Sequence, residues 1–176
     1  SITAVADVLF GDYNPSGKLP ITFYKSTSQL PDYEDYSTKG RTYRYFTDAL
    51  YPFGYGLSYT KYEVRGQKAE VGADGNGKVT VEVANTGKMD GTEVVQLYIR
   101  NLQDPNGPLK SLRAFERVGV KAGQTSTVTL SLNRKSFEFW DAETNTMRVK
   151  PGKYEILVGT SSVDQGLKRM EVEVKN

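Results

Sequence analysis

The chain has 176 residues, of which 38% are hydrophobic and 25% are charged, and its mean hydropathy is −0.53. This composition is typical of a globular protein, and no apolar run approaches the roughly 20 residues that span a bilayer, so no membrane partner is expected. Lys and Arg number 23 against 21 Asp and Glu, and the charges are mixed along the chain. Nucleic acid is therefore not an expected partner. The absence of Cys and His excludes disulfides, thiolate nucleophiles, Cys/His zinc sites and imidazole catalysis.

The first segment predicts a helix over residues 1–10. Ile2, Val5, Ala6 and Leu9 recur at the spacing of one apolar helical face, and Gly11 is a natural stop. A Pro- and Gly-containing turn over 12–17 and a short extended segment over 19–23 follow. Residues 1–25 therefore predict the closing helix and strand of an incomplete α/β domain.

Residues 26–60, here called the strap, are rich in Tyr and Phe interleaved with Gly, Pro, Asp and Arg, without a lasting helical or alternating period. A flexible linker would be poor in aromatic residues, so this composition predicts an ordered segment that packs between domains. The alternative is an aromatic platform on which sugars stack. The candidates for interdomain contact are Arg41, Tyr43, Arg44, Tyr45, Tyr51, Phe53 and Tyr55.

From residue 61 onward the hydrophobic period becomes two. Alternating apolar residues separated by Gly, Asn, Asp and Pro predict half-buried strands. The strands are expected over 61–71, 79–83, 94–99, 113–120, 128–132, 154–158 and 170–174. About seven short strands at this spacing predict an antiparallel β-sandwich of the immunoglobulin or fibronectin type III kind over residues 61–176. The single Trp140 is expected to plug the core or an edge rather than to serve as a ligand platform.

Three motifs carry a family resemblance. The motifs are ADVLFGDYNPSGKLP at 6–20, the pair GRTYRY at 40–45 and YPFGYGLSYT at 51–60, and several short motifs from Asn85 to Ser162. In their order along the chain, they resemble the C-terminal part of glycoside hydrolase family 3. That family contains the β-glucosidases and β-xylosidases, and many of its members end in a fibronectin type III-like domain. Ala114 departs from the pattern, where a Gly is expected before Phe115.

The resemblance implies a parent enzyme that binds an oligo- or aryl-glycoside and cleaves it with two carboxylates, one on an upstream barrel and one in an upstream α/β domain. It also implies that those domains are this chain's partners, and that a periplasmic or secreted location is more expected than a cytoplasmic one. It places no catalytic residue, cofactor or metal ligand in these 176 residues, and the substrate-binding residues stay unknown. The tight acidic cluster Asp32, Glu34 and Asp35 is expected to be solvated or paired with Arg41 or Arg44 rather than catalytic.

Two functions therefore stay open. One is a structural, stabilising portion of a glycoside hydrolase that is inactive by itself. The other is a stand-alone β-sandwich that binds carbohydrate or mediates adhesion.

Overall fold

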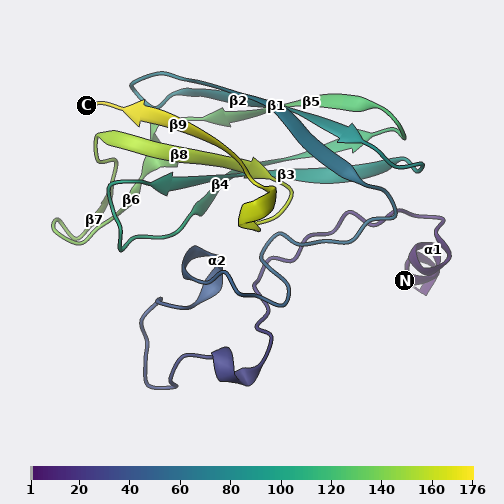
Figure 1. The fold of residues 1–176 in the computed structure, drawn as a ribbon, viewed down its shortest axis with the longest axis horizontal. Helices are drawn as coiled ribbons and strands as arrows, with labels where there is room; N and C mark the ends of the chain where they lie inside the picture. Colours follow the sequence, from purple (N-terminus) through teal and green to yellow (C-terminus); the bar gives the residue numbers. More distant parts are fainter. Residues whose placement is uncertain (1) are drawn as a thin grey trace.

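The computed structural model describes residues 2–176, so the expected helix start at Ser1 lies outside the described residues. Figure 1 shows a β-sandwich with an irregular N-terminal third lying along one side of it. The strands are β1 (Tyr62–Val71), β2 (Gly77–Asn85), β3 (Gly91–Asn101), β4 (Ser111–Val120), β5 (Thr125–Leu132), β6 (Phe139–Asp141), β7 (Thr146–Arg148), β8 (Gly152–Gly159) and β9 (Lys168–Val174). The helices are α1 (Ile2–Phe10), α2 (Thr42–Tyr45) and the 3-10 turns η1 (Thr27–Gln29), η2 (Arg134–Phe137) and η3 (Asp164–Gly166).

Two antiparallel sheets form the sandwich. One has the order β1-β2-β5 and the other β4-β3-β8-β9. The seven expected strands are present: β1 begins one residue later than expected, and the other six extend by up to three residues beyond one or both expected ends. The antiparallel sandwich is confirmed. A third, two-stranded sheet joins β6 to β7.

The core lies between the two sheets and consists mainly of β-branched residues and Leu. In β2, Val79, Val81 and Val83 are fully buried, and they alternate with more exposed neighbours as a half-buried strand should. Val95, Leu97 and Ile99 of β3 and Ile156 and Val158 of β8 face them from the other sheet, and Val128 and Leu130 of β5 lie beside them in the same sheet. Packing of this kind stabilises the sandwich through removal of apolar surface from water.

The central strand β3 departs from simple alternation, because both of its faces are buried. Gln96 and Tyr98 point away from the core, yet they are only 3% and 0% exposed. Leu157 on neighbouring β8 is buried on the same outer face. Something other than the second sheet must cover this face, and that cover is the strap.

Two expectations need correction, one for the segment 19–23 and one for Trp140. Residues 19–23 are extended but form no sheet strand. They pair with the strap through one isolated bridge between Phe23 and Tyr51 and through the amide of Leu19, which donates to the carbonyl of Tyr55 at 2.8 Å. Trp140 fills neither core nor edge, because it lies on the β6–β7 hairpin and is 55% exposed.

Candidate functional site

The inner face of the strap packs against the β3–β8 sheet through two aromatic rings. Tyr43 and Phe53 stack on each other with ring centroids 4.3 Å apart, and Tyr43 meets Tyr98 edge to face at 5.7 Å. Together with Leu157 and Leu167 they form a second apolar cluster, separate from the main core. Burial, with Tyr43 as a lesser cause, raises the pKa of the Tyr98 hydroxyl well above its usual range.

Hydrogen bonds fix this inner face. The Leu112 amide donates to the Tyr43 hydroxyl at 2.9 Å, and the Leu109 amide donates to the Arg44 carbonyl at 2.7 Å. The Ser162 amide donates to the Phe53 carbonyl at 3.0 Å. Amides of the sandwich thus use strap atoms as acceptors, so the strap is ordered by the sandwich without any other domain.

Gln96 is the centre of this attachment. Its amide nitrogen donates to the carbonyl oxygens of Gly54, at 3.2 Å, and Thr160, at 2.9 Å, while its Oε1 accepts from the Tyr98 hydroxyl at 2.5 Å. Gly54 has a φ of +77°, and a Cβ there would lie 2.1 Å from Gln96 Oε1. Only glycine fits both the backbone conformation and the close approach.

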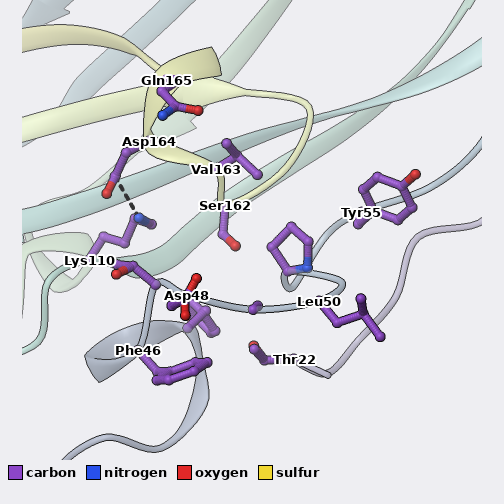
Figure 2. A pocket seen from close by; sticks show the side chains of 14 residues that line it. Thr22, Phe46, Asp48, Leu50, Tyr55, Lys110, Ser162, Val163, Asp164 and Gln165 are labelled. Carbon is purple, nitrogen blue, oxygen red and sulfur yellow. Dashed lines mark hydrogen bonds and ion pairs between the residues drawn. The ribbon is translucent and has the colours of Figure 1, made fainter. Parts of the chain in front are cut away.

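A cleft of about 540 Å³ lies between the strap and the end of the sandwich near η3. Figure 2 shows Lys110 and Asp164 on one wall of it, with Asp48 and Thr22 on the strap side. The Lys110 side chain is only 2% exposed, and its ammonium lies 2.7 Å from Asp164 Oδ1. Lys110 and Asp164 thus form a structural ion pair. No local sequence pattern predicts this pair, because the two residues lie 54 positions apart.

The outer side of the strap presents apolar side chains to solvent. Phe23, Tyr51 and Leu57 are 42%, 44% and 71% exposed, and the rings of Tyr51 and Tyr55 lie 5.4 Å apart. They line an open groove of about 700 Å³ together with Leu19 and Gly56. The apolar face of α1 is uncovered as well, with Ile2, Val5, Leu9 and Phe10 each at least 60% exposed. Contiguous exposed apolar surface of this kind marks an interaction site.

The segment that carries α1 is fastened to the sandwich by a buried asparagine. Asn14 accepts from the Ser58 hydroxyl and the Tyr59 amide, each at 2.9 Å, and donates to the Asp90 carbonyl at 3.1 Å. Lys18 and the largely buried Glu93 form an ion pair at 2.6 Å. The outer groove is therefore held in a defined position relative to the sandwich.

The seven interdomain-contact candidates fall into three groups. Tyr43 and Phe53 face the sandwich, whereas Tyr51 and Tyr55 line the outer groove. The other three, Arg41, Arg44 and Tyr45, border a further groove at the α2 side of the strap.

The acidic cluster is exposed and bonded to its own backbone. Asp32 accepts from the Glu34 amide at 3.1 Å, and Asp35 accepts from the Ser37 amide at 2.8 Å. That bond is the main cause that lowers the pKa of Asp35. Arg41 bonds to the carbonyl oxygens of Ser37 and Asp35 rather than to a carboxylate. A general acid needs a raised pKa, so the shift of Asp35 runs the wrong way for that role.

Within residues 2–176, no group of three or more Asp and Glu side chains is placed to hold a metal ion. No helix in this part of the chain is long and apolar enough to cross a membrane.

Comparisons with known proteins match nearly all of the chain. Residues 1–59 match the glycosyl hydrolase family 3 C-terminal domain, and residues 93–162 match the fibronectin type III-like domain. A protein of Xylanibacter ruminicola named xylan 1,4-beta-xylosidase is 68% identical over 97% of this chain and 20% of its own length. A periplasmic beta-glucosidase of Salmonella typhimurium is 40% identical over 93% of this chain and 24% of its own length. This chain thus spans about a fifth to a quarter of these relatives.

Solved structures of beta-glucosidases are also similar to nearly all of this chain. A beta-glucosidase from Kluyveromyces marxianus superimposes with a TM-score of 0.85 at 33% identity, over 98% of this chain and 22% of its own. A GH3 beta-glucosidase from Bifidobacterium adolescentis gives a TM-score of 0.83 at 31% identity, over 98% of this chain and 28% of its own.

Proposed function

The chain is the C-terminal part of a glycoside hydrolase family 3 protein of the β-glucosidase or xylosidase kind, and from that premise we propose that it stabilises the parent enzyme without supplying its catalytic carboxylates. The parent would hydrolyse O-glycosyl bonds of an oligo- or aryl-glycoside. The upstream barrel and α/β domains would be the partners of this chain, in a periplasmic or secreted protein.

The observation that carries the proposal is the two-sided strap. Its inner face is satisfied by the sandwich through Tyr43 and Phe53, whereas its outer groove, with Tyr51 and Leu57, is apolar and uncovered. A segment attached on one side and apolar on the other suits a bracket between two bodies. We therefore propose that residues 26–60 join the sandwich of 61–176 to the α/β domain that residues 1–25 complete.

A chimeric enzyme tests this role. The segment of the Xylanibacter ruminicola relative that matches this chain is replaced by this chain, and the Tm and xylosidase activity are measured. Tyr51→Ser with Leu57→Ser should lower the Tm of the chimera, since each exposed side chain would lose about 1 kcal/mol of burial against the upstream domains. The same pair in the isolated 176-residue chain should leave its Tm nearly unchanged, because both side chains are exposed there.

In the matched control, Tyr33 and Tyr36 are changed to Ser. These two tyrosines are 90% and 88% exposed but lie outside the groove. The control should leave the chimera unaffected. If the Tyr51 and Leu57 changes leave the Tm of the chimera unchanged, the outer groove does not pack against the upstream domains and the proposal is overturned.

A further inference from the structure

Another groove, separate from the outer groove of the strap, lies where three segments meet. It is formed by α2, the loop between β3 and β4, and the β6–β7 hairpin, and its volume is about 490 Å³. The ribbon in Figure 1 places these segments on the same side of the sandwich. The volume falls within the range of small-ligand sites.

The hairpin presents a flat apolar surface to this groove. Strand alternation turns Phe139 and Asp141 inward, at 6% and 2% exposed, and leaves Trp140 outward at 55%. Met147, the cross-strand neighbour of Trp140, is 51% exposed. Single exposed apolar residues are common, but a Trp that lines a polar groove offers a stacking surface next to hydrogen-bonding groups.

The hairpin is rigid before any ligand arrives. The buried Asp141 accepts from Lys150 at 2.7 Å, from the Thr144 hydroxyl at 2.9 Å and from the Glu143 amide at 3.2 Å. These bonds cross the turn between β6 and β7 and fix the position of Trp140. A preorganised platform loses little conformational freedom when it binds.

Two arginine side chains provide further hydrogen-bond donors to the same groove. The Arg113 guanidinium lies 4.7 Å above the Phe139 ring and donates to the Glu138 carbonyl, but its Nε is buried with no partner among residues 2–176. Arg44 borders the same groove, and neither arginine forms an ion pair with a carboxylate in the described part of the chain. A guanidinium has five N–H donors in a fixed plane, which suits neighbouring oxygen atoms of one ligand.

The charges around the groove balance. The cationic residues Arg44, Arg113 and Lys150 are matched by Asp104, Asp141 and Glu143. Such a lining gives no net attraction for an anion. The apolar indole of Trp140 together with guanidinium donors suits a neutral ring that bears hydroxyl groups.

We propose that this groove binds a neutral oligosaccharide, with a pyranose ring stacked on Trp140 and its hydroxyl oxygens accepting from Arg113 and Arg44. In this proposal the groove holds a glycan chain and does not cleave it. The features of the groove do not depend on the proposed function of the chain. Only the choice of the sugar used as the probe rests on that proposed function.

The test titrates the 176-residue chain with xylohexaose and, separately, cellohexaose, followed by two-dimensional NMR. We expect weak binding, with a Kd of about 1 mM. Chemical shift changes should centre on the Trp140 indole and the β3–β4 loop. Trp140→Ala should weaken binding at least about tenfold, while Phe115→Ala, which removes a ring 66% exposed on β4, should not change it.

A second variant guards against a local folding defect. Arg113→Lys keeps the charge and the apolar stem but loses the planar donors, so it should weaken binding, while the lost contacts with Phe139 and Glu138 lower the Tm slightly and leave the sandwich folded. Raising the salt should leave the affinity of a neutral ligand unchanged, because screening acts on charges. No binding of either sugar, or binding that Trp140→Ala leaves intact, overturns the proposal. Neither result bears on the chimera experiment, which concerns the other face of the strap.

Discussion

Replacing Gly54 by alanine should release the strap from the sandwich while leaving the sandwich folded. An alanine at φ +77° costs about 1–2 kcal/mol in backbone strain. Its Cβ would also lie 2.1 Å from Gln96 Oε1, which forces the Gln96 side chain away from Gly54, Thr160 and Tyr98. At about 1 kcal/mol for each of the three hydrogen bonds, the total cost is about 4–5 kcal/mol.

The change at Gly40 is a matched control. Gly40 lies in the same strap with a φ of +70°, but no atom lies within 4 Å of the Cβ that alanine would add. Gly40→Ala therefore carries the backbone strain without the clash. The difference between the two variants isolates the loss at Gln96, which amounts to about 3 kcal/mol.

Amide hydrogen exchange measures this difference directly. The amides of Leu109, Leu112 and Ser162 belong to the sandwich side but donate to strap atoms, so they report on strap docking. They should exchange about 100-fold faster in Gly54→Ala than in Gly40→Ala, while core amides of β2 keep their rates. Adding Gln96→Ala to Gly54→Ala removes the clashing atoms, so the double variant should be less destabilised than the sum of the two singles. Equal exchange in the two glycine variants would refute the reasoning.

Three further predictions concern the isolated chain. Limited proteolysis should cut first in the exposed stretch 32–37, further digestion should trim toward a core that begins near Tyr59 to Tyr62 on a denaturing gel, and a first stable product starting inside β2 would contradict this. The chain should not hydrolyse p-nitrophenyl β-xyloside or β-glucoside, and turnover that survives purification and is lost in Glu34→Gln would contradict that. The Lys150 ammonium chiefly holds the pKa of Asp141 below its usual range, so the stabilisation by Asp141 is complete above about pH 4 and is lost as the pH falls through the lowered value. Asp141→Asn should therefore lower the Tm at neutral pH and have little effect near pH 2, as followed by circular dichroism.

Much of the sandwich could be predicted from the sequence because alternation is a local signal. Val79, Val81 and Val83 define a half-buried strand by themselves, whatever lies opposite. The segment 94–99 also predicts a strand. The polar Gln96 in it does not indicate that the outer face of this strand is covered.

The strap could be predicted as an ordered segment, but its two faces could not be assigned. Tyr43 and Tyr51 have the same side chain, and long-range packing turns one inward and the other outward. The same limit applies to Lys110 and Asp164, and to Asn14, whose three partners lie 44 to 76 residues away. The extended segment 19–23 was wrongly expected to be a sheet strand because its pairing partner is the irregular strap.

The contacts of Asn14 make the intervening chain a closed loop. Ser58 is bonded to Asn14 across a separation of 44 residues, and both ends of the loop are held against the sandwich. The entropy cost of closing a flexible loop rises only with the logarithm of its length, by about 0.6 kcal/mol for a doubling. Extra residues inserted at the exposed tip near Tyr33 and Tyr36 would therefore cost little stability. The family could lengthen or reshape this tip without altering the sandwich that holds it.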